Sequence, residues 1–314
     1  MAVIQIEHLT KDYGHHRGIF DISFQVERGE VYGFLGPNGA GKTTTIRHIM
    51  GFSRPQRGRA FVNGLDCWKQ ASTIQRTLGY LPGELALPDS MTGTRFLRMM
   101  ADLRGVSDMT YTNQLLRTFD LDPAGQLKRM SLGMKRKLAI VAAFMHDPDV
   151  LILDEPTSGL DPIMQDQFIE FLKQQKEKGK TILLSSHLFN EVEATCDTIS
   201  IIKEGRLVST FAAEELRRRE EKTFELELRS SEQFQQFCQE VQNHADVELV
   251  SVQPDQRQVK LMVRKGKINE FIRLLSGYDL NYMSEVPFTL EDYFMKFYDR
   301  NPIQDGGGNP HAVH

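Results

Sequence analysis

The sequence has no hydrophobic run long enough to span a membrane. Its longest apolar stretches, such as Leu138–Met145, fall well short of the roughly 20 residues that a transmembrane helix needs. The N-terminus alternates apolar and polar residues over Val3–Glu7, and it has no continuous apolar core like that of a signal peptide. We therefore expect that any action at a membrane depends on a partner.

Cysteine is scarce, and positive charge is not in excess. Cys67, Cys196 and Cys238 lie far apart and fit no metal-binding or redox spacing, so we expect reduced thiols. The formal net charge of −4 provides no basic footprint for nucleic acid. The basic cluster Lys135–Lys137 is accordingly expected to be a solvated helix face.

The chain of 314 residues is too long for one small core and predicts two domains. Short apolar strands alternating with helices predict an α/β fold with a largely buried sheet over residues 1–211, interrupted by a helical subdomain at about 90–145. Residues 212–222 are predicted to be a charged connector and 223–300 a smaller accessory α+β domain. The Gly-, Pro- and polar-rich residues 301–314 are predicted to be disordered.

The accessory domain has the predicted order β-α-β-β-α-β, which is the ferredoxin-like or split-βαβ arrangement. Its predicted elements, in chain order, are Thr223–Arg229, Ser231–Asn243, Val247–Gln253, Gln258–Arg264, Lys267–Leu275 and Leu280–Val286, followed by a closing helix at Leu290–Tyr298. Two roles are open for this domain: binding a small regulator, or packing against a second copy.

The strongest chemical signal is a glycine-rich stretch between a predicted strand at Glu30–Leu35 and a predicted helix at Thr43–Met50. Its residues are Gly36, Pro37, Asn38, Gly39, Ala40, Gly41, Lys42 and Thr43, with Thr44 continuing into the helix. The spacing predicts a P-loop, whose backbone N–H groups surround phosphate at a helix N-terminus. Lys42 is expected to reach the β- and γ-phosphates and the Thr43 hydroxyl to bind Mg²⁺. The alternative, a glycine-rich turn with a surface lysine, does not explain the flanking strand and helix.

Two carboxylates, Asp154 and Glu155, follow a second apolar strand at Val150–Leu153. In a P-loop protein we expect this strand to lie directly beside the one that feeds the loop and to point Asp154 at bound Mg²⁺. Glu155 is then placed to orient or deprotonate the attacking water, because that water must lose a proton beside an anionic phosphate. Without the P-loop, the same pattern describes an exposed acidic strand end.

A second anion site is predicted at the start of the helix that runs through Met145. Ser131 is followed there by the small residue Gly133, and a helix N-terminus favours negative charge. Taken alone, an ordinary N-cap would be the default interpretation of Ser131.

Together these motifs resemble those of the ATP-binding cassette (ABC) ATPases, the motor subunits of ABC transporters. The resemblance covers roughly Ile4–Leu207. Its motifs, in the family's order, are the P-loop Gly36–Thr43, the signature-like Met130–Met134, Asp154–Thr157, the D-loop-like Ser158–Asp161, and Ser185–His187. In addition, Tyr13 takes the position of an aromatic residue that stacks on adenine, and His187 that of the switch histidine.

The resemblance implies an ATPase that uses ATP and Mg²⁺ and works as a dimer. Two cassettes enclose two ATP molecules, and each P-loop is completed by Ser131 and Gly133 of the other subunit, with Asp161 also counted in the nucleotide site. His187 is expected to contact the γ-phosphate, although a lone histidine there also fits a structural role. The implied partners are an integral membrane permease and either a second copy or a paralogous cassette, at the cytoplasmic face of the cell membrane. No nucleic acid is expected.

Two positions depart from the family's pattern. Leu132 replaces the first of two adjacent signature glycines, whereas Gly133 keeps the second. After Pro82 the family commonly has a Gln that touches Mg²⁺ and carries the signal to the membrane partner, but this chain has Gly83 and then Glu84. Either Glu84 takes over as a ligand of Mg²⁺, or the coupling uses other contacts.

Three kinds of ABC protein are open. An exporter ATPase is favoured because Glu285–Phe294 resembles the closing motif of the daunorubicin and bacitracin exporter type, and Ser131–Lys135 is typical of that branch. An importer ATPase with a regulatory C-terminal domain usually carries a β-barrel, which the predicted helices argue against. Non-transport members generally carry tandem cassettes or long coiled-coil insertions, and neither occurs here.

Overall fold

The computed structural model describes residues 2–217, 221–242, 244, 246–286 and 289–298. The chain divides into two compact units, Met1–Ala213 and Glu214–His314, which we call unit 1 and unit 2. The sequence placed this boundary two residues earlier. The predicted tail, 301–314, lies outside the described residues, as do Pro287 and Phe288 of the closing motif.

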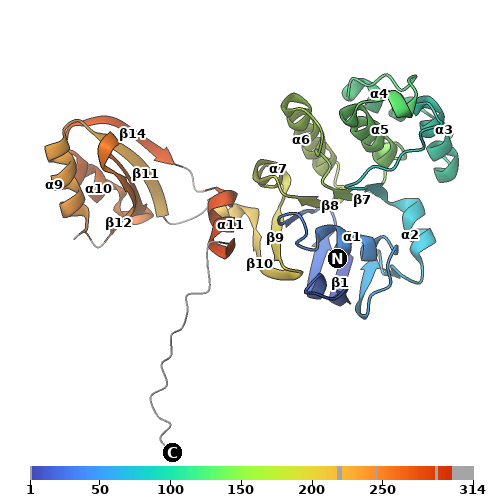
Figure 1. Ribbon diagram of the computed structural model, residues 1–314, viewed down its shortest axis with the longest axis horizontal. Helices are drawn as coiled ribbons and strands as arrows, with labels where there is room; N and C mark the ends of the chain where they lie inside the picture. Colours follow the sequence, from blue (N-terminus) through green and yellow to red (C-terminus); the bar gives the residue numbers. More distant parts are fainter. Residues whose placement is uncertain (1, 218–220, 243, 245, 287–288, 299–314) are drawn as a thin grey trace, which may run out of the picture. The chain divides into compact units, whose positions relative to one another are not determined.

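A mostly parallel sheet forms the centre of unit 1 (Figure 1). Its described strands, in spatial order, are β10 (Arg206–Ala212), β9 (Thr198–Lys203), β3 (Val31–Leu35), β8 (Thr181–Ser186), β7 (Val150–Asp154) and β6 (Gly79–Leu81). Only β10 pairs antiparallel to its neighbour. Every residue of β3, β7 and β8 is buried, as expected for parallel strands covered on both faces.

The order of these strands corrects one prediction. β8 pairs with both β3 and β7, so β7 does not lie directly beside the strand that feeds the loop. Asp154 nevertheless reaches the loop, because the carboxyl ends of parallel strands meet at one edge of the sheet. β8 ends there in Ser185 and Ser186, and the Ser185 hydroxyl donates a hydrogen bond to the Asp154 carboxylate.

A second, antiparallel sheet packs on this core. Its described strands are, in spatial order, β2 (Gly18–Glu27), β1 (Ala2–Asp12), β4 (Arg57–Val62) and β5 (Leu65–Asp66). Ile4 and Ile22 are fully buried in the same cluster as Phe34 of β3. Phe24 of β2 stacks on Tyr32 of β3, with ring centroids 5.0 Å apart. This contact packs the second sheet against the strand that leads into the glycine-rich loop.

Helices surround the central sheet. They are α1 (Lys42–Ile49), α2 (Ala71–Thr77), α3 (Gly93–Arg104), α4 (Thr110–Thr118), α5 (Leu132–Phe144), α6 (Pro162–Glu177) and α7 (Phe189–Thr195). A further short helix, α8 (Ala213–Arg217), begins at the last residue of unit 1. α3, α4 and α5 gather at one end of unit 1 (Figure 1), within the stretch predicted to be helical. No helix of the described chain has both the length and the hydrophobicity needed to cross a membrane.

The basic cluster on α5 does not behave as predicted. Lys135 and Lys137 are half-buried, and Arg136 is only 2% exposed, so the prediction of a solvated face is wrong for Arg136. The reason is its position on the helix. Arg136 stands one turn before the fully buried Ile140 and therefore shares the face of α5 that packs inward.

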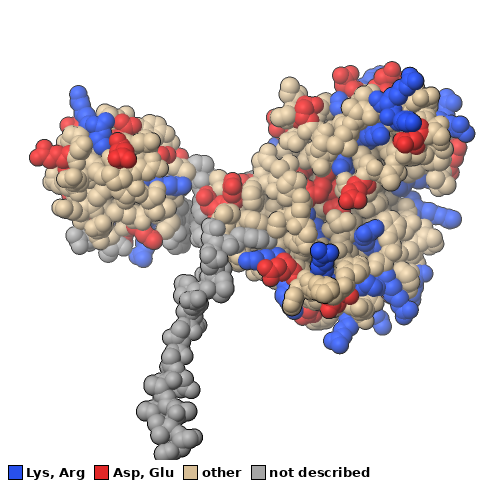
Figure 2. All heavy atoms as spheres, in the orientation of Figure 1, with Lys and Arg blue, Asp and Glu red and all other residues tan. Residues whose placement is uncertain are grey.

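On the visible face of unit 1, positive and negative side chains lie close together (Figure 2).

Unit 2 has the predicted β-α-β-β-α-β order, which is confirmed. Its elements are β11 (Glu221–Leu228), α9 (Ser231–Gln242), β12 (Val247–Gln253), β13 (Gln258–Arg264), α10 (Ile268–Leu275) and β14 (Leu280–Val286), followed by α11 (Leu290–Tyr298). The antiparallel sheet has the order β12-β13-β11-β14. Alternate residues of β11 and β13, such as Leu226 and Leu261, are fully buried with Phe237 of α9.

The core of unit 2 leads to a stability prediction. Phe237 is fully buried and meets Tyr278 edge to face, with centroids 5.1 Å apart. We expect Phe237→Ala to lower the free energy of unfolding of unit 2 by about 3–5 kcal/mol, because the cavity it leaves adds to the lost transfer free energy. Calorimetry of the full chain is the measurement. Val250→Ala, at a side chain that is 52% exposed, is the control, and equal melting of the two variants would contradict the core assignment.

Candidate functional site

The glycine-rich loop joins β3 to α1 and leaves the helix N-terminus open. Gly36 must be glycine because a Cβ there would lie 2.6 Å from the Ile202 carbonyl oxygen. Gly41, the N-cap, has a φ of 115°, in the region that favours glycine. Within the described chain no side chain caps α1. Its first N–H groups are therefore available to an anion, as the sequence predicted.

The ammonium group of Lys42 lies inside this loop. Lys42 is 5% exposed, and its Nζ donates hydrogen bonds to the carbonyl oxygens of Gly36 at 2.5 Å and Pro37 at 3.3 Å. The same Nζ lies 2.9 Å from Oε1 of Glu155. A buried positive charge is thus held where a phosphate in the loop would meet it.

Glu155 is held between Lys42 and His187. Its other carboxylate oxygen, Oε2, lies 2.5 Å from Nδ1 of His187. Its backbone has a φ of 49°, which is uncommon for a residue other than glycine and carries strain. The backbone N–H donates to the Ser185 carbonyl at 2.9 Å, and the Glu155 carbonyl accepts from Ser158 N–H at 3.1 Å. These bonds fix the strained conformation and aim the carboxylate at the loop.

Asp154 supplies a second carboxylate beside the loop. It is fully buried, and its Oδ2 accepts a hydrogen bond from the Thr43 hydroxyl at 2.9 Å. Its Oδ1 accepts one from Ser185. Burial raises the pKa of Asp154, whereas the hydrogen bonds from Ser185 and Thr43 act in the opposite direction.

The donor set around Asp154 fits magnesium held jointly with a nucleotide. Thr43 and Asp154 offer a hydroxyl and a carboxylate oxygen, the ligand type that Mg²⁺ prefers. Among the described residues no cluster of three or more His, Cys, Asp or Glu side chains could hold a metal without further ligands. Mg²⁺ commonly binds through one or two protein oxygens and substrate phosphates, so the small donor set matches that mode.

Glu191 is a buried acid that no sequence motif marks, and it binds the residue directly before His187. This α7 residue is 1% exposed, and its Oε2 accepts a hydrogen bond from the Ser186 hydroxyl at 2.5 Å. Ser186 Oγ in turn accepts from the backbone N–H of Leu188 at 3.0 Å. The two bonds hold the chain on both sides of His187. A glutamate early in a short helix normally faces solvent, so no sequence pattern marks this residue.

The remaining predicted site residues lie elsewhere on unit 1. Tyr13, in the loop between β1 and β2, is 55% exposed with Lys11 Nζ 5.7 Å from its ring centroid. Ser131 caps α5 by accepting from Met134 N–H at 3.2 Å. Asp161 caps α6 through Met164 N–H at 3.1 Å.

The structure therefore brings together part of the predicted set. Lys42, Thr43, Asp154, Glu155 and His187 form one cluster of contacts. Among the described residues, the other predicted side chains make no hydrogen bond or ion pair with that cluster; these are Tyr13, Glu84, Ser131 and Asp161, and Gly133 has no side chain to offer.

Known proteins share these elements. A family model described as "ABC transporter" matches residues 19–158. The bacitracin transport ATP-binding protein BcrA of Bacillus licheniformis is 32% identical over 300 residues, which cover 94% of this chain and 97% of that protein. The ABC transporter ATP-binding protein NatA of Bacillus subtilis is 38% identical over 64% of this chain and 84% of its own length. A solved ATP-binding subunit of an ABC transporter is 35% identical with a TM-score of 0.63, covering 69% of this chain and 92% of that one.

The buried carboxyl of Glu191 leads to a pH prediction. Burial raises its pKa from 4.5 to about 7, opposed by hydrogen bonds from Ser186 and Thr157 and assisted by the charge of Glu155. The folded chain therefore keeps a proton that the unfolded chain loses, and the free energy of unfolding falls as pH rises from 4.5 through about 7. We expect Glu191→Gln to remove this fall, so that the free energy of unfolding of the variant increases relative to that of the wild type as pH rises.

Thermal unfolding between about pH 5 and about pH 8 measures this difference. The control is Glu170→Gln, because the Glu170 side chain is 64% exposed. Melting temperatures of wild type and Glu191→Gln that run parallel across the range would contradict the assignment.

Proposed function

The chain belongs to the ABC transporter family as an ATP-binding subunit, and from this premise we propose that it hydrolyses ATP to drive export through a separate membrane permease. The observation that carries the proposal is the cluster at one edge of the sheet, where Lys42 meets Glu155 at 2.9 Å and Thr43 meets Asp154 at 2.9 Å. The loop supports phosphate binding, Asp154 supports metal binding, and Glu155 supports proton transfer.

In this proposal the substrate phosphates replace Glu155 as the partner of Lys42. The open N-terminus of α1 and the Lys42 ammonium group bind the β- and γ-phosphates, and the exposed ring of Tyr13 stacks on adenine. Thr43 and Asp154 hold Mg²⁺, which supplies charge neutralisation on the phosphate oxygens.

Glu155 is proposed to accept the proton of the attacking water. Once Lys42 turns to phosphate, Oε1 of Glu155 loses its ion-pair partner at 2.9 Å and is left facing the loop. His187 at 2.5 Å holds Oε2 and keeps the carboxylate oriented, and its exposed ring can also reach a γ-phosphate. The pair thus combines a base with an orienting group, as general-base catalysis requires.

The second half of each site is proposed to come from another cassette. Ser131, Leu132 and Met134 stand exposed at the start of α5, and Ile163 at the start of α6 is 79% exposed. A second copy, or a paralogue, that presents Ser131 and Gly133 to the γ-phosphate would cover these residues and add another helix N-terminus to the anion. Asp161, the cap of α6, belongs to the same proposed interface.

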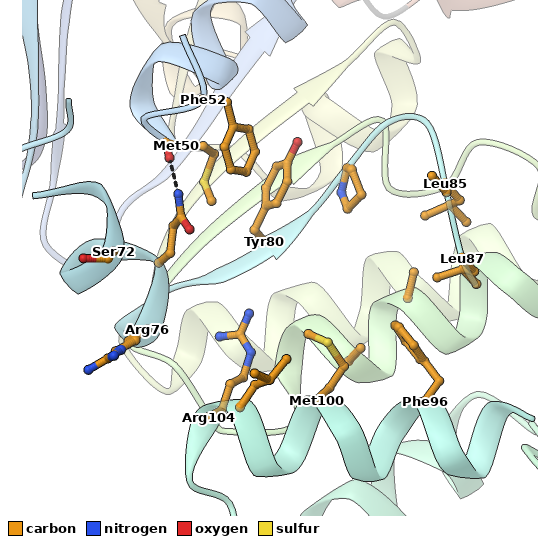
Figure 3. Close-up of a pocket in the computed structure, with 16 residues that line it drawn as sticks. Met50, Phe52, Ser72, Arg76, Tyr80, Leu85, Leu87, Phe96, Met100 and Arg104 are labelled. Carbon is orange, nitrogen blue, oxygen red and sulfur yellow. Dashed lines mark hydrogen bonds between the residues drawn. The ribbon is translucent and has the colours of Figure 1, made fainter. Parts of the chain in front are cut away.

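The membrane partner is proposed to enter an apolar groove of about 560 Å³ in unit 1 (Figure 3). Phe96 and Met100 of α3 point into it from one side, and Phe52 and Tyr80 line the other. Leu85 and Leu87 close it, on the segment where the family commonly places its coupling Gln. Such a groove suits a short apolar segment of a permease, and binding there would hold the chain at the cytoplasmic face of the membrane.

Export rather than import is favoured by unit 2 and by the relatives. Import ATPases with a regulatory domain usually carry a β-barrel, whereas unit 2 is a split-βαβ domain. BcrA, which is similar along nearly the whole chain, is a bacitracin transport protein. No nucleic acid has a part in this proposal.

Replacing the proposed base tests the dimer. We expect Glu155→Gln to slow ATP hydrolysis by about 10²–10⁴-fold, because the amide keeps the shape but cannot accept the proton. The ATP-bound dimer then accumulates and elutes early in gel filtration with ATP and Mg²⁺. The same variant with ADP is the control and elutes as a monomer. A monomer in the presence of ATP counts against the composite site.

Removing the buried ammonium group tests the loop. We expect Lys42→Ala to weaken ATP binding by about 10- to 100-fold, as loss of a charge-assisted bond to phosphate predicts. Titration calorimetry measures this affinity. Arg47→Ala, at an exposed cation of the same helix, is the control and binds ATP normally. Equal affinities of the two variants would refute the role of Lys42.

A further inference from the structure

Arg136 connects three parts of unit 1 through a single guanidinium. Its Nε donates a hydrogen bond to the Ser158 carbonyl at 3.0 Å, and its two terminal nitrogens donate to the carbonyls of Pro82 at 2.8 Å and Gly83 at 2.6 Å. Pro82 and Gly83 directly follow β6, and Ser158 lies in the turn after β7. The helix that begins beside Ser131 is thereby tied to both strand ends.

In the described chain, the guanidinium of Arg136 is bound by backbone carbonyls rather than by a carboxylate. Among the described residues all hydrogen-bond acceptors of Arg136 are backbone carbonyls, and no carboxylate is within ion-pair distance. Burial lowers its pKa, while the nearby charges of Asp154 and Glu155 favour the protonated form. An apolar side chain would anchor α5 without the cost of burying a charge. What it could not provide is a rigid fork of donors that fixes two other segments at once.

Gly83 transmits this connection to the hydrolysis site. A Cβ at residue 83 would lie 3.1 Å from Oδ2 of Asp154, the oxygen that accepts the hydrogen bond from Thr43. The backbone at Gly83 is therefore packed directly on the carboxylate, and its carbonyl oxygen is held by Arg136. Glu84, the alternative replacement for the missing Gln, is exposed and, in the part of the chain described, makes no ion pair.

We propose that Arg136 is a positioning residue that holds Gly83 against Asp154 and ties α5 to the Ser158 turn, so that α5 and the hydrolysis site move together. The inference deepens the proposed function and rests on it. It assigns to Arg136 and Gly83 the connection that a Gln after Pro82 commonly makes in the family.

The groove shown in Figure 3 is lined by residues of the same segment that Arg136 holds. Pro82 lines the groove together with Leu85 and Leu87, and Ala139, on the turn of α5 after Arg136, lines it too. An apolar segment that enters the groove therefore presses on the same stretch of backbone that Arg136 holds. Its effect reaches Asp154 without any contact to nucleotide.

The first experiment compares Arg136→Ala, Arg136→Lys and the neighbouring control Lys137→Ala in the full chain. We expect both Arg136 variants to lose about 10- to 100-fold in kcat, since a small misplacement of a catalytic group has effects of this size. ATP affinity stays within about threefold, because the phosphate-binding residues are untouched. Methylguanidinium restores part of the kcat of Arg136→Ala and does not affect Arg136→Lys. Lys137→Ala behaves as wild type.

Hydrogen exchange separates this inference from the proposed function. In Arg136→Ala, exchange rises together in the peptides 81–87 and 157–160, whether or not the chain hydrolyses ATP, and in Lys137→Ala neither peptide changes. A wild type without ATPase activity would refute the proposed function and leave this result standing. Unchanged exchange, or a wild-type kcat in Arg136→Ala, would overturn the role of Arg136.

Gly83→Ala is the second variant in case Arg136→Ala does not fold. The added methyl group presses on Asp154 and leaves every donor of Arg136 in place. We expect kcat to fall by about tenfold or more with ATP affinity within about threefold of the wild type. A Gly83→Ala enzyme with the wild-type kcat would overturn the proposed contact between this segment and Asp154.

Discussion

The ion pair between Lys42 and Glu155 is the interaction on which the rest of the site depends. The two side chains are only 5% and 15% exposed, so their charges interact with little screening by water. Each charge neutralises the other. Under the proposed function, an arriving phosphate takes Lys42 and leaves Glu155 with His187 alone. Binding of the substrate phosphates then also frees the Glu155 carboxylate to act as the base.

The sheet and the helices bring that pair together and connect it to the surface. β3 leads into the loop, and β7 ends in Asp154 with Glu155 directly after it. β8, between these two strands, supplies the serines that hold Asp154 and the segment of His187. Arg136 extends the connection to α5, whose exposed N-terminus is the proposed contact with a second cassette. The apolar groove lies on the same segment. Nucleotide, second cassette and permease would therefore act on one continuous network.

Much of this could be predicted from the sequence, because local patterns specified it. The spacing around Lys42 and the apolar strand before Asp154 predicted both halves of the cluster, and the local patterns of apolar residues predicted the β-α-β-β-α-β order of unit 2 and its closing helix. Features that depend on distant contacts were missed. The strand between β3 and β7 follows from tertiary pairing, the left-handed backbone of Glu155 from bonds to Ser185 and Ser158, and the burial of Arg136 from its place on the inner face of α5.

The central claim is that the loop is half of a composite site in which phosphate displaces Glu155 from Lys42. A structure of the chain with Mg²⁺ and a non-hydrolysable ATP analogue tests it most directly. The account predicts Lys42 Nζ on the β- and γ-phosphates, Glu155 facing the γ-phosphate, and Ser131 of a second cassette on the same phosphate. Nucleotide bound while Lys42 stays paired with Glu155, or a γ-phosphate that meets only one chain, would contradict it.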